Sequence, residues 1–169
     1  MVKIERVSDF YRDWEPQDLL ARKYKSMSPL PIRGGWGYSK EDAVVIDTTH
    51  PAAAHWQPFQ GVRIEHAFAQ LRMYEELIGI RPEGSQHAGC EKRPLEQMLV
   101  RGDEGKLYDV LRFEIKALPL DVWERLKAEW EAGVDSPGFD RAEHECRREA
   151  AMVRYVGEYW FEISSFFGK

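Results

Sequence analysis

The segment from Tyr108 to Ile163 constrains the fold most, because its apolar residues change period twice. Within Tyr108–Leu118, one alternating set is apolar and the other is charged: Leu111, Phe113, Ile115 and Ala117 against Arg112, Glu114 and Lys116. This period of two predicts a strand with one face in the core and one in water. The turn residues at 101–105 predict an antiparallel partner strand over 95–100.

Helical periodicity follows directly. Asp121 and Glu124 match a capping box and Gly133 supplies a stop, which predicts a helix over 121–133 with one apolar side, formed by Val122, Trp123, Leu126 and Trp130. Asp140 with Glu143 repeats the pattern before a second helix over 141–151, whose apolar side is thin and consists of Ala142, Cys146 and Ala150. The alternation from Val153 to Ile163 predicts a terminal strand.

The order of these elements predicts an α+β fold, since it has no regular strand–helix–strand alternation and no repeat. We expect a single domain over residues 1–169, with a mostly antiparallel sheet and the two helices of the C-terminal half packed on one face. The composition agrees, because 43% hydrophobic and 31% charged residues are typical of a chain that folds around its own core.

Residues 61–80 fit two templates. Ile64, Phe68 and Leu71 have helical spacing, whereas Val62, Ile64, His66 and Phe68 alternate as in a strand. We favour a strand over 62–69, and a single long helix is the alternative. The polar stretch 82–94 predicts a surface loop, and Pro16 predicts the first turn of a short helix.

A glycine-rich turn, residues 34–38, precedes a short apolar strand that is predicted over 43–47. Gly34, Gly35 and Gly37 surround Trp36 and lead to Tyr38. Two exposed aromatic residues on a rigid loop would be good anchors for a partner. The alternative, which we favour, is that Trp36 closes the edge of the core while the glycines permit a tight path.

The residues around this turn are the candidate partner- or ligand-binding residues: Trp36, Tyr38, Glu41, Asp42, Asp47 and His50. We assign no catalytic residue, because no nucleophile elbow, phosphate loop or dinucleotide fingerprint occurs. A small enzyme or ligand-binding domain with a pocket near residues 34–50 remains the alternative.

We expect no metal and no cofactor. The spacing of Asp47, His50 and His55 matches no compact metal motif. His144 and Cys146 would point in different directions on a helix, and we expect Cys146 to be a small buried residue.

The charge balance favours a protein partner over nucleic acid. The chain has 24 basic and 29 acidic residues, a formal charge of −5, which lacks the basic footprint that binding to a phosphate backbone requires. An acidic surface of this kind suits a basic protein partner, although mild acidity also keeps many proteins soluble, which is the interpretation that we favour; a homo-oligomer stays open. No apolar run approaches the length of a membrane span and the first residues do not resemble a signal peptide, so we expect no membrane contact and a cytoplasmic location.

Residues 33–47, with Tyr74–Ile78 and Tyr159–Ile163, resemble a family of small bacterial cytoplasmic proteins of unknown function that carry an RGGWGYSKEDAVVID-type segment. The resemblance implies similarity to immunity proteins that neutralise toxins, and it carries over no catalytic residue. We therefore expect a non-catalytic protein-binding module.

Overall fold

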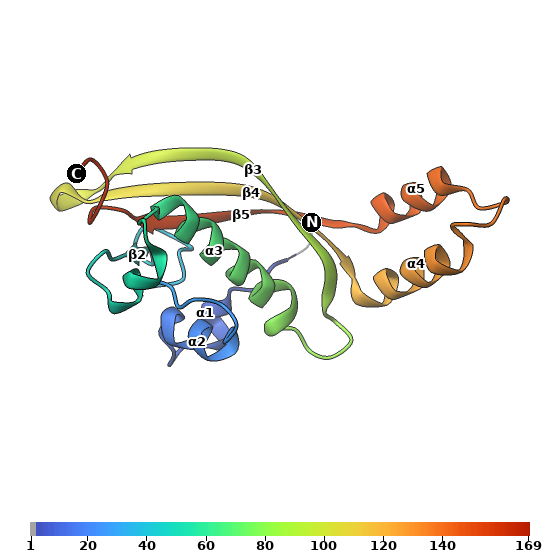
Figure 1. The fold of residues 1–169 in the computed structure, drawn as a ribbon, viewed down its shortest axis with the longest axis horizontal. Helices are drawn as coiled ribbons and strands as arrows, with labels where there is room; N and C mark the ends of the chain where they lie inside the picture. Colours follow the sequence, from blue (N-terminus) through green and yellow to red (C-terminus); the bar gives the residue numbers. More distant parts are fainter. Residues whose placement is uncertain (1–2) are drawn as a thin grey trace.

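The structure, a computed structural model, describes residues 3–169 and confirms the α+β class with a mostly antiparallel sheet (Figure 1). The five strands lie in the order β1-β2-β5-β4-β3. Among the strand pairs in this described range, only β2–β5 is parallel. The strands are β1 (Ile32–Gly34), β2 (Val44–Ile46), β3 (His87–Arg101), β4 (Leu107–Pro119) and β5 (Val153–Glu162).

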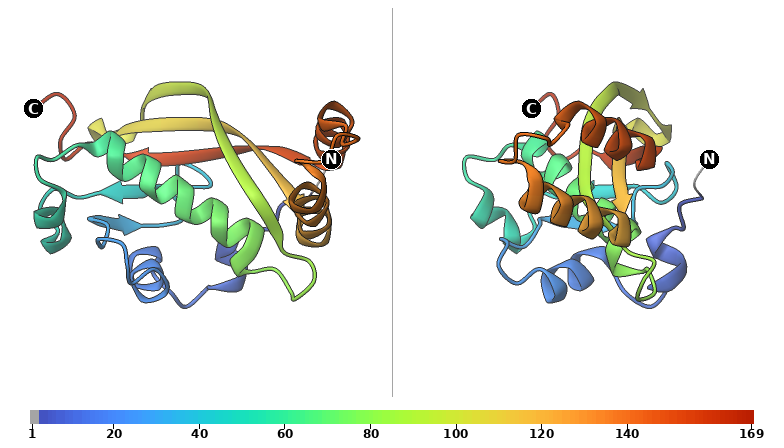
Figure 2. Two further views of the ribbon diagram at one scale, coloured as in Figure 1. Left: turned by 45° about the vertical axis from the view of Figure 1, so that its right-hand side comes forward. Right: turned by 90° about the vertical axis from the view of Figure 1, so that its right-hand side faces the viewer.

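Helices cover one face of this sheet. Helix α3 (Gly61–Tyr74) lies across that face, and α1 (Val7–Phe10) and α2 (Pro16–Lys23) lie below it (Figures 1 and 2). Pro16 stands in the first turn of α2, as predicted. The remaining helical segments are η1 (Pro51–Trp56), the π-helix η2 (Glu75–Gly79), η3 (Asp103–Gly105), α4 (Leu120–Gly133) and α5 (Arg141–Ala151).

The strand expected over 62–69 is wrong, because this stretch belongs to α3. Ile64, Phe68 and Leu71 form one buried side of the helix, whereas Val62 is 58% exposed and does not share that side. The apparent alternation came from Val62, which is exposed, and from His66, which is half-buried at the side of the helix with its ring against Phe113. Phe68 and Trp36 both belong to the main core, and the centroids of their rings are 6.2 Å apart.

The loop expected over 82–94 is also shorter than predicted, since β3 begins at His87. This strand pairs with β4 from His87 to Arg101 and has register shifts between Ala88 and Glu91 and again beside Pro94. An edge strand with polar, exposed side chains needs no regular apolar pattern, and it tolerates a proline because one side of its backbone is unpaired. The sequence therefore did not reveal it.

The other face of the sheet carries ion pairs between strands. Arg112 of β4 pairs with Glu158 of β5 at 2.9 Å and with Glu96 of β3 at 3.3 Å. Arg93 and Glu114 form a similar pair at 3.1 Å. No helix among residues 3–169 lies over this face, which confirms the charged, solvated side predicted for β4.

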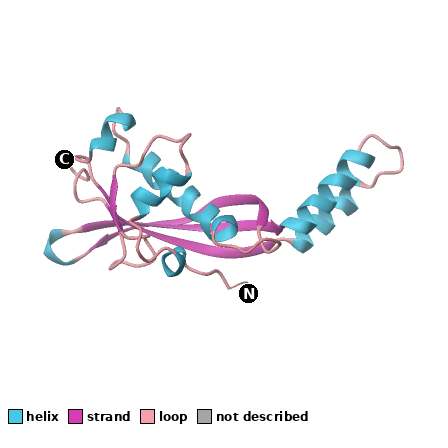
Figure 3. Ribbon diagram, turned by 90° about the horizontal axis from the view of Figure 1, so that it is seen from below, coloured by secondary structure: helices cyan, strands magenta, loops and turns pink. Residues whose placement is uncertain are grey.

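The position expected for α4 and α5 needs correction. They form a hairpin that extends beyond the end of the sheet instead of packing on its face (Figures 1 and 3). Since β4 and β5 stay paired as far as Ala117 and Val153, the two helices leave from the strand ends. They have a small core of their own, formed by Leu118, Leu126 and Met152 and separate from the main core.

Of the two predicted helix caps, that of α5 is confirmed and that of α4 is wrong. The Asp140 side chain accepts a hydrogen bond from the Glu143 N–H at 2.9 Å, which confirms the cap of α5. Asp121 does not cap α4, because that helix begins one residue earlier, after Pro119, and has no side-chain cap.

Candidate functional site

An ionised side chain, Arg72 of α3, lies in the centre of the core with 1% of its surface exposed. Its guanidinium is sandwiched between two rings, 4.1 Å from the centroid of Tyr38 and 3.6 Å from that of Tyr159. It pairs with Glu76 at 3.1 Å and donates to a backbone carbonyl of the glycine-rich turn at 3.0 Å and to one of β5 at 2.6 Å. The cation is therefore committed to partners within the chain.

The π-helix η2 buries two consecutive glutamates, and each of them has partners within the chain. Glu76 accepts hydrogen bonds from the hydroxyl groups of Tyr155 at 3.0 Å and of the tyrosine in the glycine-rich turn at 2.8 Å. Glu75 pairs with Lys23 at 2.6 Å and accepts from the Tyr24 hydroxyl at 2.8 Å, which ties α2 to the core. π-Helical turns are frequent at functional sites, but these carboxyl groups are occupied by their own chain.

A second buried carboxyl pair joins α3 to β4. Burial and the neighbouring charge of Asp109 raise the pKa of Glu65 to about 8. Burial also raises the pKa of Asp109, although Gln97 donates a hydrogen bond to it at 2.6 Å. Glu65 therefore holds a proton at neutral pH and can donate it in a hydrogen bond to Asp109.

The glycine-rich turn contributes to the core. Trp36 is 3% exposed, so the prediction that it closes the edge of the core is confirmed. The Tyr38 hydroxyl also accepts the N–H of Val7 at 2.9 Å and so holds the N-terminal segment. Two glycines permit this path, because Gly37 has a φ of +77° and a Cβ at Gly35 would collide with the Asp42 side chain.

Three other candidate residues stabilise local turns. Asp42 accepts a backbone N–H of the glycine-rich turn at 3.3 Å. Hydrogen bonds from Thr49 and the pairing with Arg33 at 2.6 Å lower the pKa of Asp47 to about 2. His50 accepts a backbone N–H at 3.1 Å and caps η1.

Glu41 is the candidate residue that lines an open hollow. The hollow has a volume of about 450 Å³ and lies between the segment 34–45 and the turn that joins β3 to β4. Lys40 lines it from the first of these segments, and Glu104 and Lys106 line it from the second. The other five candidate residues lie outside its lining, so the structure does not bring the six into one site.

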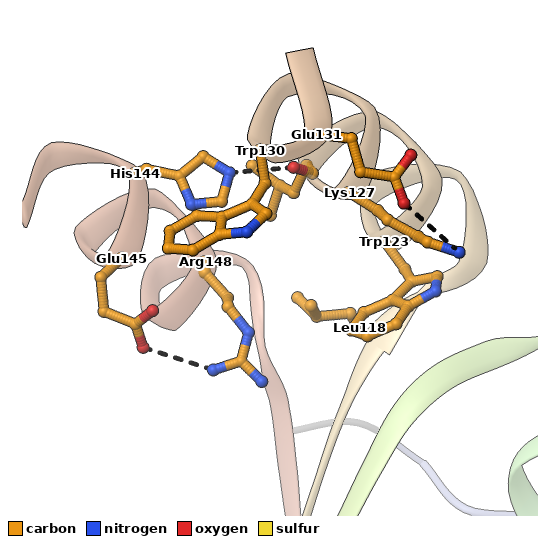
Figure 4. A pocket seen from close by; sticks show the side chains of 9 residues that line it. Leu118, Trp123, Lys127, Trp130, Glu131, His144, Glu145 and Arg148 are labelled. Carbon is orange, nitrogen blue, oxygen red and sulfur yellow. Dashed lines mark hydrogen bonds and ion pairs between the residues drawn. The ribbon is translucent and has the colours of Figure 1, made fainter. Parts of the chain in front are cut away.

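An apolar groove of about 380 Å³ opens between α4 and α5 (Figure 4). Leu118 and Leu126 form its floor, and Trp123 and Trp130 form its walls. Two ion pairs border it, Lys127 with Glu131 at 3.9 Å on α4 and Arg148 with Glu145 at 3.3 Å on α5. A rigid concave surface with aromatic walls and a charged rim is typical of a recognition site.

His144 holds the two helices of the hairpin together. Its Nε2 lies 2.9 Å from the Leu126 carbonyl oxygen, which can only accept, so the ring donates this bond. The ring also lies 5.6 Å from that of Trp130 and 5.5 Å from that of Phe139, and so Trp130 is fixed at the groove while 41% exposed. Cys146 is exposed, and its expected burial is wrong.

Sequence reasoning missed this groove, because it assigned Trp123 and Trp130 to a helix face that covers the sheet. One signal was available. The apolar side predicted for the helix over 141–151 consists of Ala142, Cys146 and Ala150, which is too small to cover a sheet.

Comparison with known proteins adds no assignment. No family model matches the chain, and no curated protein or solved structure matches it either. The resemblance based on residues 33–47 therefore stays a prediction.

Within residues 3–169, no group of three His, Cys, Asp or Glu side chains is placed to hold a metal ion. None of the helices in that range combines the length and the apolar content that crossing a bilayer requires.

Replacing Arg72 should show how far the core depends on it. Arg72→Leu leaves the Glu76 carboxyl group buried without its cation, so we expect the free energy of unfolding to fall by about 3–5 kcal/mol in urea titrations. Arg112→Leu is the matched control, because Arg112 is likewise paired with carboxylates, those of Glu96 and Glu158, but lies on the solvated face. Equal losses for the two variants would show that the buried pair has no special role.

Glu65→Gln should change the pH dependence of stability. The ordinary pKa of this carboxyl group is 4.5 and its pKa in the fold is about 8. Between these values the folded chain binds more protons than the unfolded chain, so the free energy of unfolding falls as pH rises, by up to about 1.4 kcal/mol per unit. The glutamine keeps a donor for Asp109 and does not titrate.

We therefore expect urea titrations at pH 5 to 8 to show that Glu65→Gln becomes increasingly more stable than the wild type as pH rises. Glu83→Gln, at an exposed loop position, should follow the wild type. Parallel stability profiles for Glu65→Gln and the wild type would contradict the raised pKa of Glu65 in the folded chain.

Proposed function

We propose that the chain is a non-catalytic protein-binding module whose α4–α5 hairpin docks on a basic protein. The observation that carries this proposal is the charge of the hairpin. Residues 120–151 contain nine acidic and five basic residues, so they hold −4 of the formal charge of −5. The rest of the chain is almost neutral.

The geometry of the hairpin supports this role. It extends past the sheet, where a partner can reach both helices (Figure 3). The buried bonds of Arg72 and Glu76 stiffen the unit that carries it. A projecting acidic element on a rigid base suits electrostatic steering, which raises association rates and weakens as salt increases.

The biological role that we propose is that of an immunity protein, which binds a toxin and neutralises it. A protein that neutralises a toxin needs a surface that covers its target and needs no reactive centre. The resemblance of residues 33–47 to small bacterial proteins favours this role, and the acidic hairpin would match a basic toxin.

The second candidate is ligand binding at the hollow beside Glu41. Its volume of about 450 Å³ is sufficient for a small molecule, and its lining includes two lysines and four carboxylates. Native mass spectrometry of the purified protein tests this candidate. A retained small molecule that Lys40→Ala releases would favour it over the protein-binding role.

Neutralising charges on the hairpin should weaken binding more than neutralising the same number elsewhere. The partner is first captured from cells of the source organism, identified by mass spectrometry and purified. Its association is then measured by surface plasmon resonance at low and high salt. The hairpin variant is Asp121→Asn, Glu124→Gln and Asp135→Asn, and the matched control is Asp13→Asn, Asp18→Asn and Glu83→Gln.

All six positions are exposed, and none has an ion pair within residues 3–169. At low salt we expect the hairpin variant to slow association about tenfold and the control much less. Both variants lose three negative charges, so a difference between them reports where the charges lie and not the net charge. Equal effects of the two variants, or a partner without a basic surface, would contradict the proposal.

A further inference from the structure

We infer that the groove between α4 and α5 receives a basic amphipathic helix of the partner, which completes a three-helix bundle. This inference rests on the proposed function and names the structural element that the hairpin recognises. Its starting point is that two helices packed side by side leave an open apolar groove on one side (Figure 4).

The shape of the groove fits a helix. Leu118 and Leu126, both almost fully buried, form its floor, and the indoles of Trp123 and Trp130 line it about two helical turns apart on α4. Side chains spaced three and four residues apart on a third helix would pack between such walls, as ridges pack into grooves in helical bundles. The groove runs between the helices and is open to solvent, so an incoming helix needs no rearrangement of the hairpin.

The charge of the hairpin around the groove sets the charge of that helix. Glu131 lines it from α4, and Glu124 lies one and two turns before Lys127 and Glu131 on the same side of that helix. Glu145 lines it from α5, and Glu91 of β3 reaches its edge through an ion pair with Arg148 at 3.2 Å. The lining itself holds two carboxylates and two cations, Lys127 and Arg148, and the negative excess belongs to the hairpin around it, which carries a charge of −4 over residues 120–151. An apolar stripe flanked by lysines or arginines complements this arrangement.

A second copy of the chain is the poorer occupant. Two hairpins would each contribute a charge of −4 from residues 120–151, and these like charges would repel across the shared groove. A basic helix gains from the same charges.

The test uses the full-length protein and two synthetic peptides of about 18 residues, long enough for five helical turns. In the patterned peptide, leucines recur at i, i+3, i+4 and i+7 and lysines fill the remaining positions. The scrambled peptide has the same composition without a continuous apolar side. Isothermal titration calorimetry gives the affinity of each peptide for the wild type and for two variants, Trp130→Ala and Trp14→Ala.

We expect the patterned peptide to bind at least about tenfold more tightly than the scrambled one. Trp130→Ala should remove this advantage, and Trp14→Ala should keep it, because Trp14 is similarly exposed, at 39% against 41%, but lies far along the chain from the groove. In the wild type, the indole N–H signals of Trp123 and Trp130 should shift in NMR spectra when the patterned peptide is added, whereas that of Trp36 should not. The NMR readout remains decisive if Trp130→Ala perturbs the hairpin.

Three results would overturn the inference: equal affinity for the two peptides, no binding of either, or a dimer in light scattering that Trp130→Ala dissociates. If the peptides bind equally and the hairpin charge variant still weakens capture of the natural partner, the inference fails and the proposed function stands. If that charge variant also has no effect, both fail.

Discussion

The buried guanidinium of Arg72 is the interaction on which the rest of the structure depends. It lies between two tyrosine rings and joins three distant parts of the chain: α3, the glycine-rich turn and β5. Burying a charge is costly unless the charge is paired and hydrogen-bonded, so this position fixes the conformation of each partner. The path of the glycine-rich turn, the inward direction of Tyr38 and the anchoring of Val7 all follow from it.

This internal pairing explains where binding can occur. The inner face of the sheet is filled by α3, and the outer face carries ion pairs between the charges of neighbouring strands. The α4–α5 hairpin differs from both, because its small core holds the two helices together without filling the groove between them. Most of the excess negative charge also lies there. The scaffold and the element that we propose for binding are therefore separate parts of one fold.

Local patterns predicted much of the secondary structure and less of its arrangement. The strand around Phe113 and the helix capped by Asp140 were predictable, because alternation and capping are properties of a few neighbouring residues. Periodicity shows which side of a helix is apolar but not what covers that side, so the hairpin was placed on the sheet. Helix α3 was misassigned for a related reason: the exposed Val62 imitates the alternation of a strand.

The candidate site was also predictable only as far as local sequence reaches. The glycine-rich turn stood out because its residues are unusual, but that composition serves the buried Arg72 network. The groove depends on how far apart two helices pack, which no single segment encodes.

Hydrogen–deuterium exchange of the wild type with and without the patterned peptide tests the central claim, that the hairpin binds while the scaffold stays unchanged. We predict slower exchange confined to residues 120–151. Protection centred on residues 34–50, or spread through α3 and the sheet, would contradict the account.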